Sequence, residues 1–208
     1  MGSPQPEPIG VVLAGGRGRR LGGDKAIAML AGRALAGYPL RALHAVLVDV
    51  RVVAKPDTPL DGLEGAEVWR EPRFPSHPLV GIVHALALAA PRAVLVCAAD
   101  MPFVSAAVVA RLASEDARGA PAVIATRGDA LEPLLGRYEQ AAAELLAPAA
   151  REGRAPLRAV VASIGPRVID LSGEHPELLF NVNTPDDLTR AEVILSRLMT
   201  ERRLGAGA

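Results

Sequence analysis

A glycine-rich basic segment follows the first apolar stretch of the chain. Residues 15–25 read GGRGRRLGGDK, with five glycines, three arginines and one lysine in eleven residues, directly after the apolar run Ile9 to Leu13. Glycines let backbone N–H groups approach phosphate oxygens and turn inward as an anion-binding nest, because they carry no Cβ. Arg20 and Lys25 would add positive charge. This composition favours a polyphosphate cradle over the alternative, a tight turn with solvated basic side chains.

Two better-known phosphate motifs do not fit this segment. A Walker A loop reads G-x-x-x-x-G-K-[ST], whereas Gly23 is followed by Asp24-Lys25-Ala26, which lacks the hydroxyl that binds Mg²⁺. A Rossmann fingerprint reads G-x-G-x-x-G, whereas Leu21 takes the place of its third glycine, where a side chain prevents close helix packing. The segment is therefore neither a P-loop nor a dinucleotide-binding turn.

A carboxylate stands at the end of another apolar run. Asp100 follows residues 94–99, which predicts that it lies at the carboxyl end of a buried strand, on the sheet edge that also carries the glycine-rich segment. Mg²⁺ takes one or two protein carboxylates and completes its octahedron with phosphate oxygens and water. The alternative is that Asp100 caps the following helix, but Ser105 is better placed for that role. We therefore predict a metal site at Asp100.

Two amide side chains lie close together near the end of the chain. Asn181 and Asn183 are two residues apart on a segment that reads as a short strand, so both side chains are expected to face the same way. Thr184 can cap the next helix, and Pro185 suits its first turn. The asparagines form either a ligand-binding face or a pair that stabilises the loop by capping backbone groups.

Apolar runs alternate with helix-like stretches along the chain, and this order predicts the elements that position these residues. Runs rich in β-branched residues predict strands at residues 9–13, 47–53, 66–69, 93–97, 122–125, 131–138 and 167–171. Apolar residues at three-to-four spacing predict helices at residues 35–46, 79–90, 106–115, 140–151 and 185–198. Such alternation favours parallel strands joined by crossover helices. We expect an α/β fold, with a mostly parallel central sheet flanked by helices in three layers.

Length and composition favour one globular domain. The chain has 208 residues, 50% hydrophobic and 22% charged, and no apolar run approaches the length of a membrane span. Lys plus Arg equals Asp plus Glu at 23 each, so the chain lacks the global basic field of a nucleic-acid binder. We expect the domain to span residues 9–200, between a disordered N-terminus at 1–8 and a frayed C-terminus at 201–208.

The cysteine content and the N-terminal residues bear on location. A single cysteine and four scattered histidines exclude an internal disulfide framework and a thiolate metal cage. The first ten residues, MGSPQPEPIG, lack the positive and apolar regions of a secretory signal. We therefore expect a cytoplasmic protein that binds neither nucleic acid nor a membrane.

Four motifs together resemble those of the molybdenum cofactor guanylyltransferases, which are MobA-like NTP transferases. The string LAGGRGRRLGGDK at residues 13–25 is similar to the family pattern L-A-G-G-x-S-x-R-M-G-x-D-K, from which it departs at Gly18 and Leu21. The other motifs follow in the family's order: PLVG at 78–81, ADMP at 99–102 for the metal loop, and FNVNTP at 180–185. The resemblance covers most of the chain and implies a Rossmann-like nucleotidyltransferase fold. His77 stands where the family has a glycine.

The resemblance also implies an activity. It is that of a Mg²⁺-dependent enzyme that transfers GMP from GTP to the terminal phosphate of molybdopterin and releases pyrophosphate. Lys25 and Arg20 would bind the β- and γ-phosphates, and Asp100 would hold Mg²⁺. The residues expected to contact nucleotide, metal or pterin are Leu13, Ala14, Gly15, Gly16, Lys25, Glu71, Gly81, Asp100, Asn181 and Asn183. Transient contacts with other molybdenum cofactor biosynthesis proteins and with molybdoenzyme chaperones are implied as well.

The choice of guanine depends on two positions. Glu71 ends the third predicted strand, where the family has an acidic residue, often Asp, that contacts the nucleotide. A carboxylate suits guanine because the N1–H and the 2-amino group are both donors. The alternative is a solvated charge within the run REPR at 70–73. Gly16, in the string LAGG at 13–16, also favours guanine, because cytidylyltransferase relatives typically read L-A-A-G.

Two other functions stay open. The first is the same chemistry with another pairing, such as CTP with molybdopterin or a nucleotide with a phosphosugar. The second is a nucleotide-binding protein without activity that serves as an accessory in molybdoenzyme maturation. The presence of both Lys25 and Asp100 argues against this second alternative.

Overall fold

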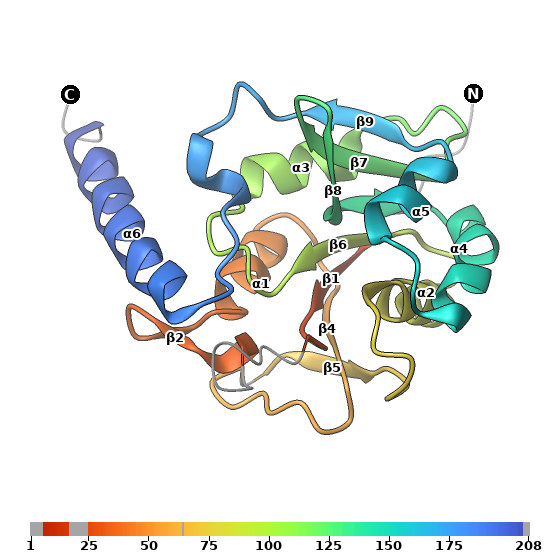
Figure 1. The fold of residues 1–208 in the computed structure, drawn as a ribbon. Helices are drawn as coiled ribbons and strands as arrows, with labels where there is room; N and C mark the ends of the chain where they lie inside the picture. Colours follow the sequence, from red (N-terminus) through yellow and green to blue (C-terminus); the bar gives the residue numbers. More distant parts are fainter. Residues whose placement is uncertain (1–5, 17–24, 64, 206–208) are drawn as a thin grey trace.

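The computed structural model describes residues 6–16, 25–63 and 65–205, with side chains as far as residue 201, and centres on one sheet. The seven-stranded sheet has the order β5-β4-β1-β6-β8-β7-β9 (Figure 1). Its strands are β1 (Ile9–Leu13), β4 (Val50–Ala54), β5 (Glu67–Arg70), β6 (Val94–Ala98), β7 (Ala122–Arg127), β8 (Ala130–Tyr138) and β9 (Arg167–Asp170). Neighbouring strands are parallel except at β8, which runs antiparallel to both β6 and β7. The expected mostly parallel sheet is confirmed.

Helices cover both faces of the sheet because alternate strand residues point to opposite sides. Val12 packs in one apolar cluster with α1 (Gly37–His44) and α3 (Ala106–Ser114). Its neighbour Val11 packs in the other cluster, with α2 (Pro78–Ala89), α4 (Ala141–Glu152) and α5 (Leu157–Ser163). The three expected layers are therefore present in Figure 1.

A smaller apolar cluster lies beside the main layers. The last helix, α6 (Pro185–Gly205), packs near the hairpin of β2 (Met29–Leu30) and β3 (Arg33–Ala34), to one side of the sheet in Figure 1. The buried members of this smaller cluster are Leu30, Leu35, Val182 and Ala191. Two short 3₁₀ helices, Lys25–Ile27 and Pro176–Leu179, lead into this region. Within the described ranges, no helix combines the length and apolar character needed to cross a membrane.

Some elements differ from those the sequence predicts. The short helix α5 and the β2–β3 hairpin are additional, and α6 continues to Gly205 rather than ending at Leu198. The expected strand around Asn181 and Asn183 is wrong. The backbone there makes a single bond to the loop after β6, from Val182 N–H to the Asp100 carbonyl (3.0 Å), before α6 begins.

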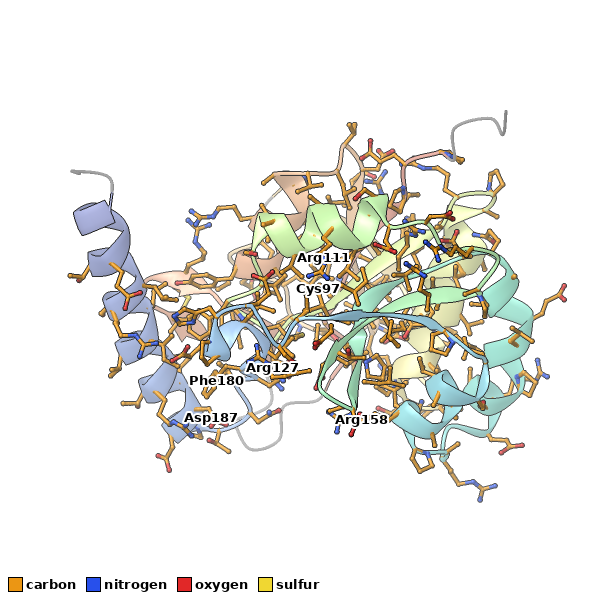
Figure 2. The ribbon with its side chains drawn as sticks, turned by 90° about the horizontal axis from the view of Figure 1, so that it is seen from above. Cys97, Arg111, Arg127, Arg158, Phe180 and Asp187 are labelled. Carbon is orange, nitrogen blue, oxygen red and sulfur yellow. The ribbon has the colours of Figure 1, made fainter. Side chains whose placement is uncertain are left out.

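Thr184 caps the start of α6 as the sequence predicts, and the structure shows that the cap is reciprocal with Asp187. Asp187 N–H donates to Oγ1 of Thr184 (3.1 Å), and Thr184 N–H donates to Oδ2 of Asp187 (3.0 Å). Asp187, labelled near the start of the helix in Figure 2, also accepts from Asn183 N–H (3.1 Å). These hydrogen bonds lower the pKa of Asp187. The cap therefore fixes the backbone of Asn183.

We predict that Thr184→Ala lowers the free energy of unfolding by about 1 kcal/mol, because the helix loses its side-chain cap. Urea denaturation measures this change. Thr189→Ala is the matched control, since Thr189 lies exposed on the same helix and bonds only the Pro185 carbonyl. Equal losses in both variants would contradict the capping role.

Candidate active site

Four parallel strands bring their following residues to one edge of the sheet. Leu13 is in register with Val53 and with Ala98, and Val53 is in register with Trp69. Two positions beyond these four residues stand Gly15, Lys55, Asp100 and Glu71. Backbone bonds continue the ladders past the strand ends: Ala14 N–H to Val53 (2.8 Å), Ala99 N–H to Leu13 (3.1 Å) and Glu71 N–H to Ala54 (3.0 Å). The sheet register therefore places the site.

A cavity of about 170 Å³ lies at this edge. The predicted site residues that line it are Leu13, Ala14, Gly15, Gly16, Lys25, Glu71, Gly81 and Asp100. Lys55 and His77 line it as well, although the sequence predicted no role for either residue. The signal for Lys55 was its place directly after a buried strand. Arg20, the remaining predicted catalytic residue, lies outside the described residues.

Lys25 joins two of the predicted site residues. Its ammonium forms an ion pair with Oδ2 of Asp100 and donates to Oδ1 of Asn183 (2.6 Å). The side chains of Lys25 and Asp100 are 15% and 16% exposed, so the pair is shielded from solvent yet borders the cavity. Oδ1 of Asp100 is buried and has no hydrogen-bond partner among the described residues. This oxygen is therefore free to bind a ligand.

The two asparagines do different things. Asn183 reaches Lys25, whereas Nδ2 of Asn181 donates to the Leu179 carbonyl two residues earlier (3.0 Å). The loop-stabilising alternative therefore describes Asn181 in this structure, and neither asparagine lines the cavity itself. The segment is held against the loop after β6 by Val182 and by contact between the rings of Phe103 and Phe180, whose centroids are 6.2 Å apart.

Glu71 and Lys55 form a buried ion pair. Glu71 is 5% exposed and Lys55 6%, and Nζ of Lys55 lies 3.3 Å from Oε1 of Glu71. Burial raises the pKa of Glu71, and the neighbouring Lys55 partly offsets that rise. The alternative of a solvated charge at position 71 is therefore wrong. Oε2 of Glu71 is buried without a hydrogen-bond partner among the described residues.

Two glycines leave room for this carboxylate. A Cβ on Gly15 would lie 2.1 Å from Oε1 of Glu71, closer than atoms can approach. A Cβ on Gly81 would lie 3.1 Å from Oε2 and 3.0 Å from Cδ2 of Leu13. Gly16, by contrast, faces open space, with no described atom within 4 Å of an added Cβ. Close approach therefore explains Gly15 and Gly81.

Two other polar side chains, those of His77 and Ser105, serve as helix caps. Nδ1 of His77 accepts from Leu79 N–H (3.2 Å) at the start of α2, and Nε2 lies 3.0 Å from the Ala155 carbonyl. His77 therefore caps α2 in the tautomer that carries hydrogen on Nε2. Ser105 caps α3 by accepting from Val108 N–H (3.3 Å). As expected, the cap of α3 is Ser105 and not Asp100.

The donor set at Asp100 fits a hard divalent cation that also binds phosphate. The described residues contain no group of three or more His, Cys, Asp and Glu side chains that could hold a metal. Mg²⁺ needs only one or two carboxylates when phosphate oxygens and water supply the other ligands. The free Oδ1 of Asp100 can serve as such a carboxylate ligand. Fold and site together define an α/β protein with a candidate ligand cavity at the carboxyl edge of its sheet.

Comparison with known proteins identifies the family. The model of the MobA-like NTP transferase domain matches residues 10–168. Molybdenum cofactor guanylyltransferases from Desulfosudis oleivorans and Cereibacter sphaeroides are 31% and 33% identical to this chain, covering 89% and 91% of it and 95% and 97% of those proteins. The crystal structure of molybdopterin-guanine dinucleotide biosynthesis protein A from Archaeoglobus fulgidus has a TM-score of 0.75 at 29% identity, covering 90% of this chain and 98% of that one. The chain belongs to the MobA-like NTP transferases.

We predict that Gly15→Ala lowers the free energy of unfolding by about 1 to 3 kcal/mol, because the added methyl group displaces the buried Glu71 carboxylate. Gly16→Ala is the matched control and should change stability by less than about 0.5 kcal/mol, since its Cβ meets no described atom. Urea denaturation of both variants checks this. A change in the free energy of unfolding of Gly15→Ala as small as that of Gly16→Ala would contradict this, because it would mean that the Glu71 carboxylate can move away from the added methyl group.

Proposed function

We propose that this protein transfers GMP from GTP to the terminal phosphate of molybdopterin. The observation that carries the proposal is the cluster of Lys25, Asp100 and Asn183 at the sheet edge that also presents the Gly15-Gly16 backbone. The guanylyltransferase relatives, which align over most of this chain, support the choice of substrates. Transient contacts with other proteins of molybdenum cofactor biosynthesis would deliver the acceptor and receive the product.

The reaction requires alignment more than acid–base chemistry. An oxygen of the acceptor phosphate attacks the α-phosphorus of GTP, the bond between the α-phosphorus and the bridging oxygen to the β-phosphate breaks, and pyrophosphate leaves with the electron pair. The attacking phosphate oxygen is already anionic near neutral pH, so no general base is needed. Lys25 and Arg20 neutralise charge on the leaving phosphates, and the amides of Ala14, Gly15 and Gly16 hold the remaining oxygens. Holding the two anionic substrates side by side in one cavity supplies the remaining rate acceleration.

Asp100 would hold the divalent cation, which we propose is Mg²⁺. When bound, this ion neutralises phosphate charge and orients the α-phosphate toward the acceptor. Lys25 pairs with Oδ2 of Asp100 while Oδ1 is free, so Asp100 can bind a cation without losing its protein partner. Glu71 would accept hydrogen bonds from the guanine edge.

Titration with GTP, CTP and ATP in the presence of Mg²⁺ tests the nucleotide. We expect calorimetry to give the tightest binding for GTP, because the buried carboxylate of Glu71 accepts from the two adjacent donors of guanine. Tighter CTP binding would favour the cytidylyl alternative. Tight GTP binding without any transfer would favour an accessory role in molybdoenzyme maturation.

We predict that Asp100→Asn abolishes metal-dependent turnover while the fold survives, because it keeps the side-chain shape but removes the charge that a hard cation prefers. Turnover across a Mg²⁺ titration, together with urea denaturation, measures both effects. Asp116→Asn, a change at an exposed residue that does not line the cavity, is the control. Full activity, or an unfolded Asp100→Asn protein, would make Asp100 a structural residue.

We also predict that Asn183→Ala slows transfer while GTP affinity stays near that of the wild type, because its amide would bind the acceptor. Losing one hydrogen bond to a charged oxygen costs about 1.5 to 3 kcal/mol. Asn181→Ala is the comparison variant and should retain more activity, since its amide donates to the Leu179 carbonyl. An equal loss of GTP affinity and transfer in Asn183→Ala would place this residue with the nucleotide instead.

A further inference from the structure

We propose that Lys55 is a positioning residue for base recognition: it fixes the Glu71 carboxylate so that Oε2 is the acceptor for the donor edge of the base. This inference rests on the proposed function, because it assumes that the base of GTP reaches Glu71. Lys55 does not need to touch the nucleotide for this purpose. It acts through its buried partner.

The ammonium of Lys55 is fully used by the protein. Its Nζ donates to the Pro72 carbonyl (2.6 Å) and lies within hydrogen-bond distance of the Pro75 carbonyl (3.4 Å) and 3.3 Å from Oε1 of Glu71. Three acceptors match the three N–H bonds of an ammonium group. Lys55 therefore has no donor left for a ligand, although it lines the cavity.

The carboxylate of Glu71 is constrained on both sides. Its Oε1 is held by Lys55 and lies against the backbone of Gly15, where not even a Cβ would fit. Its Oε2 lies beside Gly81, and no described residue gives it a hydrogen bond. A buried carboxylate oxygen without a donor is unfavourable, so this oxygen is suited to a donor that arrives with a ligand. Gly15 and Gly81 leave the space that this carboxylate occupies.

The donor edge of guanine fits this acceptor. Its N1–H and 2-amino group are adjacent donors, whereas adenine and cytosine each offer a single amino group next to a ring acceptor nitrogen. An ionised carboxylate oxygen is acceptor only, so it would repel those ring nitrogens. The discrimination therefore requires that Glu71 be both ionised and fixed in place.

Lys55 is the cation that keeps Glu71 ionised. The other titratable groups nearby are His77 and His84 of α2, and His84 has its pKa lowered by burial, which favours its neutral form. Lys25 lines the same cavity but is paired with Asp100. Because burial already raises the pKa of Glu71, loss of Lys55 would raise it further. Protonation would then begin at higher pH and replace the acceptor by a donor.

The test measures GTP affinity by calorimetry in Mg²⁺, from mildly acidic to mildly alkaline pH, for Lys55→Met, Glu71→Gln and the double variant. We expect Lys55→Met to weaken GTP binding about tenfold or more near neutral pH, with recovery as the pH rises. In the Glu71→Gln background, Lys55→Met should have little further effect, because the residue it positions is gone. Arg73→Met is the control, since this exposed cation lies on the same loop and pairs only with exposed Asp57.

Three results would overturn the proposal. An equal, pH-independent loss from Lys55→Met in both backgrounds would make Lys55 only a support for the loop at 72–75. An unchanged GTP affinity in Lys55→Met would show that Glu71 needs no partner. Normal GTP binding by Glu71→Gln would show that recognition of the base does not depend on the Lys55–Glu71 pair, and it would leave the proposed transfer activity untouched. A wild-type protein that binds no GTP would instead refute the proposed function itself.

If Lys55→Met does not fold, Lys55→Gln gives the same test. Glutamine keeps an N–H donor for the Pro72 carbonyl but carries no charge. We expect GTP binding by this variant to be lost at higher pH than in the wild type, as for Lys55→Met. A pH profile identical to that of the wild type would overturn the proposal.

Discussion

Asp100 is the residue at which three distant parts of the chain meet. Its carbonyl accepts from Val182 N–H, and its carboxylate pairs with Lys25, whose ammonium also reaches Asn183, 158 residues further along the chain. Each contact depends on β6 ending at the same edge as β1. Asp100 thus adds an ion pair to the direct hydrogen bond between Lys25 and Asn183 and ties both to the loop after β6. The site therefore follows from the register of the sheet.

The two carboxylates at this edge have different surroundings, which suits them to different tasks. Asp100 is paired through one oxygen and borders the cavity, so its second oxygen is available to a cation held together with phosphate. Glu71 is more deeply buried: burial raises the pKa of its carboxyl group, and Lys55 holds the carboxylate in place. It is therefore suited to binding a neutral base by hydrogen bonds. The same sheet edge thus offers separate candidate positions for the phosphates and for the base of the proposed nucleotide.

The sequence predicted the sheet well because its strands are buried runs with strong periodicity. The bounds of β1 were correct, and Asp100 was placed at the sheet edge because an entirely buried strand precedes it. Helix α5 was missed because it has seven residues, of which only Val161 is buried, so it shows almost no periodic pattern. The sequence at Asn181–Asn183 reads like a strand, but the hydrogen-bond partner of this segment is the loop after β6, which sequence spacing cannot reveal.

The pairing of Lys55 with Glu71 could not be predicted for a related reason. Each residue follows its own strand, and the spacing of 16 positions between them has meaning only once β4 and β5 are known to be parallel neighbours. The charged run at 70–73 left a solvated position open for Glu71, whereas the glycines at 15 and 81 allow the carboxylate to be buried. The kind of chemistry that Glu71 can perform was therefore predictable, but the burial and the charged neighbour that set its pKa were not.

The function proposed for this sheet edge is the joining of GMP to a phosphorylated pterin. The most direct measurement is a transfer assay with GTP, molybdopterin and Mg²⁺ that follows pyrophosphate and the dinucleotide product together. We expect equal amounts of both, with GTP strongly preferred over CTP. Pyrophosphate released without a molybdopterin product, or transfer only from CTP or only to a sugar phosphate, would contradict it.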